Sequence, residues 1–313
     1  MSCLVPGVSG ARLFDRGRPA NDRLLRMIAL GLAHLTALDL PPADLVREAG
    51  RAGFRSVGLR LHPAMAGGAA YPARIGSCAY RELRAALAGE GVRLHEVEFI
   101  PLVPEIDVPS LAGVLETGAS LGAAAVTVSG DDPDAARLGA SFAALCDLAA
   151  EFGLRADLEF MRWRAVGTLA QALAVLRQAD KPNGAILVDA LHLNRSGGQP
   201  GDLRDVPACF LRAAQLCDAA PAMPAPEAVI AEAREGRLLP GEGGLPLPAL
   251  LAALPADVAL SVETPMRGLD AKARIAAAYA ATHRRLHLLL YLGCCNKALF
   301  VSVCGVVIEI GQN

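Results

Sequence analysis

The sequence contains very few lysines. Only Lys181, Lys272 and Lys297 are found among its 30 basic residues. None of them stands at the end of a predicted strand, where a lysine that forms a Schiff base with a carbonyl substrate would be expected. This scarcity argues against a lysine-dependent aldolase.

The chain also lacks an excess of positive charge. Its formal net charge is -2 at pH 7 over 313 residues, whereas dedicated nucleic-acid-binding proteins carry a basic excess or a basic stripe. We therefore expect a small-molecule substrate and no nucleic-acid partner. Endonuclease-like DNA repair is disfavoured for the same reason, and because the sequence has no histidine-rich set for several metal ions.

Targeting and cysteine motifs are missing as well. The eight cysteines form no CxxC pair and show no zinc-like spacing with histidine. No apolar segment near the start is long enough for a secretory signal, so we expect a cytoplasmic protein. The apolar end of the chain contains Asn296 and Lys297, which are costly inside a bilayer, so we expect no membrane association. The sequence leaves open whether the chain forms a homo-oligomer.

Short apolar segments alternate with segments of helical periodicity along most of the chain. This alternation predicts an α/β fold, a parallel (β/α)8 TIM barrel. A doubly wound open sheet is the alternative, but no glycine-rich phosphate-binding motif follows the first strand. The eight predicted strands are 27–35, 55–62, 93–100, 124–130, 154–160, 185–192, 210–219 and 258–265.

The chain divides into three expected parts, which are an N-terminal extension over 1–23, a barrel over 24–285 and an apolar C-terminal tail over 286–313. Within the barrel, residues that end or cap helices mark several boundaries. We expect Gly53 to end one helix, Asp132 or Asp134 to begin a second, and Thr168 to cap a third.

Polar residues end the last four predicted strands. In a parallel barrel the carboxyl ends of all strands meet at one rim, where active sites of this fold lie. Neighbouring strands are ~4.8 Å apart, so four such side chains can converge on one cation with oxygen ligands at ~2.0 to 2.6 Å. Each alone could be a helix N-cap or part of a rim ion pair. Several buried carboxylates without a cation would be costly, so the sequence predicts a metal site. The proposed ligands are Glu159, Asp189, Gln215 and Glu263.

Three further residues are candidates for contact with a substrate. Arg60 and His62 share one face of the second predicted strand, where they would either bind a carboxylate or hydroxyl groups or lie in solvent. The single tryptophan, Trp163, closely follows Glu159 and would either form a wall of the pocket or pack in the core.

Several segments together resemble the sugar phosphate isomerase/epimerase family, whose members have a xylose isomerase-like TIM barrel. The resemblance covers about residues 27–285 and implies that Glu159, Asp189 and Glu263 bind a metal. The segments are "GLRLHP", "LEFMRW", "LVDALHLNRSGG", "QLCDA", "RLLPGEGGLPL" and "LSVETP".

The resemblance also has implications for the residues around these ligands. The epimerases often have a histidine ligand on the seventh strand, where this chain has Gln215, a change shared with some dehydratase-like members. His192 matches the family's DxxH histidine, which implies a contact with the substrate or with a metal ligand; a rim histidine held by a backbone carbonyl is the alternative. The family's PGxG loop over the active site corresponds to the segment around Arg237 and Glu242, two expected substrate contacts that could also form a simple turn with a salt bridge. Three carboxylates and one amide suit manganese or magnesium better than zinc.

These residues lead to one main hypothesis and two alternatives. A single divalent ion would hold adjacent oxygens of a sugar-like hydroxy-carbonyl substrate while Glu159 or Glu263 removes a proton, giving an isomerase or epimerase that acts through an enediolate. A dehydratase of a cyclic polyol ketone or keto acid would begin with the same proton abstraction. A non-catalytic binding barrel is the remaining alternative.

Overall fold

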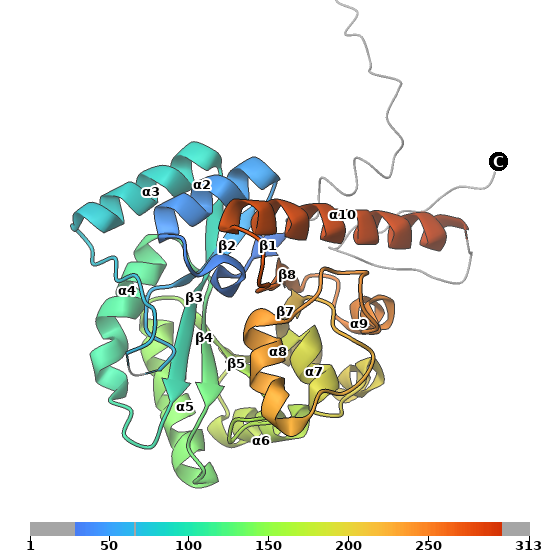
Figure 1. Ribbon diagram of the computed structural model, residues 1–313. Helices are drawn as coiled ribbons and strands as arrows, with labels where there is room; N and C mark the ends of the chain where they lie inside the picture. The colour runs from blue at the N-terminus through green and yellow to red at the C-terminus, as the bar shows by residue number, and fades with distance from the viewer. Residues whose placement is uncertain (1–28, 66, 296–313) are drawn as a thin grey trace, which may run out of the picture.

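The computed structural model describes residues 29–65 and 67–295, and over these residues the chain forms a closed barrel of parallel strands. Strands that follow one another in the sequence are neighbours, and the last strand pairs with the first. Helices cover the outside of the barrel (Figure 1). The prediction of a TIM barrel is therefore confirmed. The strands are β1 (Gly31–Leu32), β2 (Ser56–Arg60), β3 (Arg93–Leu102), β4 (Ala125–Gly130), β5 (Arg155–Glu159), β6 (Gly184–Asp189), β7 (Leu211–Leu216) and β8 (Ala259–Val262).

Helices connect the strands along the chain. The α-helices are α2 (Pro42–Ala52), α3 (Cys78–Glu90), α4 (Ala112–Ser120), α5 (Ala135–Glu151), α6 (Leu169–Ala179), α7 (Ala190–Arg195), α8 (Val229–Glu235), α9 (Leu247–Ala253) and α10 (Ala271–Cys295). Short 3₁₀ helices are η1 (His34–Ala37), η2 (Val108–Leu111), η3 (Pro200–Asp205), η4 (Ala208–Phe210) and η5 (Pro226–Ala228).

The helix boundaries follow the local signals in the sequence. Gly53 ends α2 with a φ of 113°, a left-handed conformation that favours glycine. The Thr168 hydroxyl accepts a hydrogen bond from the Gln171 backbone and caps α6. Asp134, rather than Asp132, caps α5 in the same way.

The strands β1 and β6 end earlier than the apolar segments that suggested them. β1 contains only two residues because the chain turns into η1 at His34. The predicted strand 185–192 ends at Asp189, and Ala190 begins α7. The Asp189 carboxylate accepts the backbone N–H of His192 and so caps that helix. This turn places Asp189 and His192 together at the carboxyl-terminal rim.

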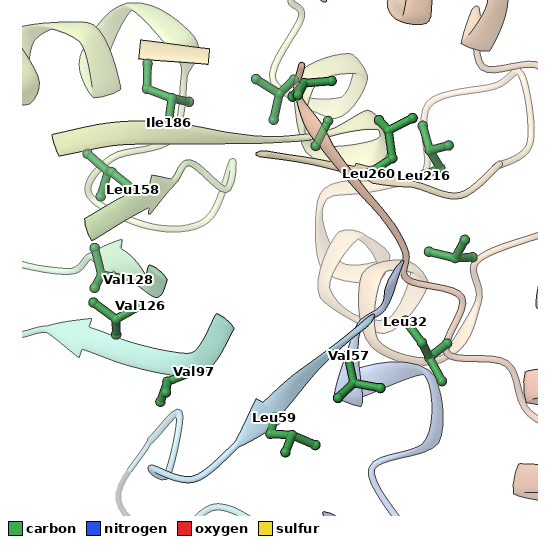
Figure 2. Close-up of a cluster of buried hydrophobic side chains, with 14 of the residues drawn as sticks. Leu32, Val57, Leu59, Val97, Val126, Val128, Leu158, Ile186, Leu216 and Leu260 are labelled. Atoms are coloured by element: carbon green, nitrogen blue, oxygen red, sulfur yellow. The ribbon is translucent and has the colours of Figure 1, made fainter. Parts of the chain in front are cut away.

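Side chains along the strands alternate between an aliphatic and a polar environment. Val126 and Val128 belong to the large hydrophobic cluster that joins the strands to the helices (Figure 2). Thr127, which lies between them, faces the opposite side of the sheet and donates its hydroxyl to Glu96 on the neighbouring strand. The hydrophobic core therefore lies mainly between the barrel and the helices, and polar groups occupy much of the barrel interior.

The last helix of the described chain is α10. This helix continues through the expected boundary at residue 286, and Leu286 packs in the hydrophobic core. The expected extension over 1–23 and the final part of the expected tail, 296–313, lie outside the described residues. Within the described part of the chain, no helix combines the length and the apolar character needed to cross a membrane.

Candidate functional site

The four predicted metal ligands lie at the carboxyl ends of the last four strands. Glu159 and Asp189 are the final residues of β5 and β6. Gln215 on β7 is in register with Asp189, and Glu263 directly follows β8. None of the four is more than 5% exposed.

Two observations indicate that these residues could hold a cation. Ligand atoms of Glu159, Asp189 and His192 all lie within 4.8 Å of one another, a group that includes His192 and leaves out Glu263. Gln215 lines the same cavity as Glu159 and Glu263, and its buried Oε1 has no hydrogen-bond partner in the described chain. A buried acceptor of this kind needs a partner, and a cation beside three carboxylates would supply one. The donor set therefore fits a divalent metal ion.

Arg237 connects two of the carboxylates. Its Nη1 lies 2.5 Å from Asp189 and its Nη2 lies 2.7 Å from Glu263. Its Nε donates to the carbonyl of Ala233, which fixes the guanidinium against the end of α8. With all groups ionised, Glu159, Asp189 and Glu263 bring three negative charges against the one positive charge of Arg237. Among these four residues alone, two negative charges remain, which is the number that a divalent cation balances.

The protonation of these carboxyl groups reflects burial and crowding. Burial, followed by the charges of Glu263 and Asp189, raises the pKa of Glu159 well above its ordinary value. Burial raises the pKa of Glu263 to about 7, although Arg237 opposes the shift. Burial is also the largest single influence on Asp189 and would raise its pKa, but the charge of Arg237 and the hydrogen bonds from Arg237 and the His192 backbone together outweigh burial and lower the pKa. The site thus contains one firmly ionised carboxylate and two that a cation would help to ionise.

His192 lies at the centre of the same cluster. Its Nε2 is 3.5 Å from Glu159 and 3.5 Å from an Nη of Arg237, and its ring packs edge-on against Trp163 at 5.1 Å between centroids. Burial lowers the pKa of His192 to about 4, so the imidazole is neutral at pH 7. Trp163 lines the cavity and also packs against the hydrophobic core, so it has both of the expected roles.

A second buried acidic pair, on β3, was not anticipated from the sequence. Glu98 accepts the backbone N–H of His34 at 3.0 Å, and its other oxygen lies 3.5 Å from Arg60. Glu96 accepts the hydroxyl of Thr127. Burial, followed by repulsion from Glu98, raises the pKa of Glu96 to about 8. The spacing of two residues in "HEVEF" was the available signal, because it places both acids on one face of a strand.

Some of the other candidate residues line the cavity, and others lie outside it. Arg60 is the buried last residue of β2 and lines the cavity. His62 lies beyond the end of the strand, is half-buried and does not line the cavity. Arg237 is part of the cluster, whereas Glu242 is exposed and lies outside the lining. The proposed substrate contacts of His62 and Glu242 stay predictions.

These residues surround a cavity of about 330 Å³, a size suited to a small molecule. Its lining includes the acidic groups Glu98, Glu159 and Glu263 and apolar side chains such as Phe99 and Trp163. Such a cavity can bind the oxygen atoms of a small compound through polar groups and contact its carbon skeleton with apolar side chains.

The chain is similar in sequence to a known family of barrels and to proteins of known activity. The family model for the xylose isomerase-like TIM barrel matches residues 46–285. The 3-dehydroshikimate dehydratase of Pseudomonas aeruginosa is 34% identical over 109 residues, which are 34% of this chain and 17% of that protein. The chain therefore matches only a small part of that relative.

Solved structures agree on the fold. A xylose isomerase-like TIM barrel/4-hydroxyphenylpyruvate dioxygenase fusion protein superposes with a TM-score of 0.71 at 21% identity, covering 88% of this chain and 45% of that one. The IolI protein with a bound zinc atom gives a TM-score of 0.67 at 18% identity, covering 81% of this chain and 96% of that one. At these identities the likeness concerns the fold alone.

Proposed function

Because the chain belongs to the xylose isomerase-like TIM barrel family, we propose that it is a divalent-metal-dependent enzyme that removes a proton beside the carbonyl group of a small hydroxy-carbonyl compound. One observation carries this proposal: the buried cluster at the rim combines three carboxylates with an amide oxygen that has no partner in the described chain. The zinc atom bound by the similarly folded IolI protein supports the metal requirement.

The ligands would be Glu159, Asp189, Gln215 and Glu263. A bound divalent cation would polarise the substrate carbonyl and lower the cost of the negative charge that develops on its oxygen. Metal analysis after reconstitution distinguishes manganese, magnesium and zinc.

Glu159 is the better placed of the two candidate bases. One oxygen of Glu263 is held by Arg237 at 2.7 Å, which reduces its basicity. Glu159 forms no such ion pair with an arginine of the described residues, and it lines the cavity beside neutral His192. Glu159 would take the proton from carbon, and the N–H of neutral His192 would donate a hydrogen bond to a substrate oxygen.

Loss of water is better supported as the outcome than isomerisation, although both begin with this proton transfer. The curated match at 34% identity is a dehydratase, and Gln215 stands where epimerases of this family often have histidine. In the dehydration, the C–H electron pair forms the new double bond and the C–O bond of the β-hydroxyl breaks. The hydroxide then leaves as water with the proton that Glu159 carries.

The test combines metal analysis with proton exchange. The purified chain, reconstituted with manganese, magnesium or zinc, is incubated in deuterated water with 3-dehydroshikimate and with a panel of ketoses. Isomerised sugar supports the isomerase, and loss of water with a new conjugated absorbance supports the dehydratase. Deuterium exchange alone supports only the proton abstraction that the two reactions share. Glu159→Gln should abolish exchange and turnover.

Asp189→Ala is the control for the metal, because it should lose the ion along with activity. Full turnover of the wild-type chain after stoichiometric removal of metal would contradict the proposal. Retention of both metal and full turnover in Glu159→Gln would remove Glu159 from its role as the base.

A further inference from the structure

Three arginines from separate segments of the chain line the same cavity. Arg60 ends β2, Arg164 lies between β5 and α6, and Arg234 lies in the last turn of α8. Guanidinium groups repel one another, so three of them around one small cavity favour a bound anion wherever protein carboxylates do not neutralise them. The question is whether carboxylates of the protein neutralise these three arginines.

Arg60 is compensated only in part. Its side chain is 9% exposed, and its nearest carboxylate oxygen, on Glu98, is 3.5 Å away, which is too long for a strong hydrogen bond. Its buried Nε has no hydrogen-bond partner in the described chain. The guanidinium instead lies over the ring of Phe99, at 5.6 Å from the centroid. Arg60 therefore has donors that a ligand in the cavity could use.

The other two arginines differ in how far protein carboxylates compensate their charge. Arg164 binds Asp131 through Nη1 at 2.8 Å, but its buried Nε has no partner in the described chain. Arg234 forms no ion pair with any residue that the structure describes. Desolvation, followed by repulsion from Arg164 and Arg60, lowers the pKa of Arg234. The cavity thus holds a cationic region without an internal counterion for Arg234.

We propose that the substrate carries an anionic group, a carboxylate or a phosphate, and that Arg60, Arg164 and Arg234 bind it inside this cavity. The inference rests on the proposed function, because the anion would orient the hydroxy-carbonyl part of the same molecule toward Glu159. Guanidinium groups recognise carboxylate and phosphate oxygens through paired, charge-assisted hydrogen bonds. The acidic cluster and the three arginines would then fix the two ends of one substrate.

The single tryptophan offers a direct measurement of anion binding. Trp163 lines the cavity, so its fluorescence should respond when the cavity fills. The metal-reconstituted chain is titrated with inorganic phosphate and, separately, with benzoate, at constant ionic strength and pH 7. The expected result is saturable binding of one of the two probes. Phosphate as the better ligand indicates a phosphorylated substrate, and benzoate indicates a carboxylate.

Two matched substitutions locate the binding. Arg234→Gln removes an exposed side chain from the cavity, and Arg177→Gln removes an exposed arginine of α6 that does not line it. We expect Arg234→Gln to weaken binding of the preferred probe by roughly tenfold or more and to raise KM for an anionic substrate while kcat changes little. Arg177→Gln should match the wild type.

The result that overturns the inference is the absence of saturable binding of either probe, or equal affinity in Arg234→Gln and Arg177→Gln. This titration needs no turnover. Metal binding and deuterium exchange with neutral ketoses, without anion binding, would therefore reject the anionic substrate and leave the proposed function standing. Anion binding that depends on Arg234, in a chain that holds no metal after reconstitution, would reject the proposed function instead.

Discussion

The guanidinium of Arg237 lies 2.5 Å from the carboxylate of Asp189, and both side chains are buried, at 1% and 0% exposure. The other oxygen of Asp189 accepts the backbone N–H of His192. Both ordinary roles of an acid at a strand end, a helix cap and an ion pair, are therefore present at Asp189. They hold its carboxylate in one orientation, and such support is what a metal ligand requires.

Arg237→Met should destabilise the metal-free protein by about 3 to 5 kcal/mol, because it leaves buried Asp189 and Glu263 without their cation. An excess of manganese should restore part of this loss, since the metal replaces the missing charge. Urea unfolding with and without metal measures both effects. Arg237→Lys keeps the charge and should lose less. A metal-free Arg237→Met protein as stable as the wild type would show that the ion pair has no net role.

Gln215→His should shift the metal preference toward zinc. An imidazole nitrogen suits zinc better than an amide oxygen does, whereas an all-oxygen site favours harder ions. After reconstitution with equal manganese and zinc, we expect the bound zinc-to-manganese ratio to rise by about tenfold relative to the wild type. Elemental analysis gives the ratio directly. An unchanged ratio would indicate that Gln215 does not contact the metal.

The residues at the strand ends could be predicted from the sequence, because the parallel strands of a barrel all have their carboxyl ends at one rim. Glu159, Asp189 and Gln215 needed only the approximate positions of the strands and their parallel order. Arg60 and His62 were expected on one face, but β2 ends at Arg60, and the alternation of side chains ends with it. Strand periodicity cannot be applied beyond the last paired residue.

Contacts that depend on loop geometry could not be derived in this way. Arg237 and Glu242 stand in one loop and were equal candidates, yet only Arg237 turns inward, where Ala233 and two carboxylates hold it. Glu96 was overlooked because a strand reading of β3 emphasises its apolar residues. The polar interior of the barrel emerges only when the strands are assembled.

Gly58→Ala should test how tightly that interior is packed. A Cβ at Gly58 would overlap the Glu98 carboxyl oxygen that accepts the backbone N–H of His34. Displacing it would leave a buried donor unsatisfied, and we expect a loss of about 1 to 3 kcal/mol in urea unfolding. Gly89→Ala, in α3 with no atom within 4 Å of its Cβ, is the matched control. It should be neutral or stabilising, and similar losses in both variants would argue against the specific overlap.

Glu96→Gln should change how stability depends on pH. The pKa of Glu96 is raised from 4.5 to about 8, so between these values the folded chain holds a proton that the unfolded chain has released. This contribution is complete below pH 4.5 and is lost as the pH rises toward 8, with a slope of up to about 1.4 kcal/mol per pH unit. The glutamine side chain does not titrate, so the variant does not lose this contribution as the pH rises. Its stability relative to the wild type should therefore increase from pH 5 to pH 8.

Urea unfolding at pH 5, 6, 7 and 8 measures this difference for the wild type, Glu96→Gln and Thr127→Val. The Thr127 hydroxyl donates to Glu96 and lowers its pKa, so Thr127→Val should extend the loss of stability to higher pH. Parallel curves for the wild type and Glu96→Gln would mean that Glu96 is ionised over the whole range. A buried carboxylate beside Glu98 would then need a neutralising cation of its own inside the barrel.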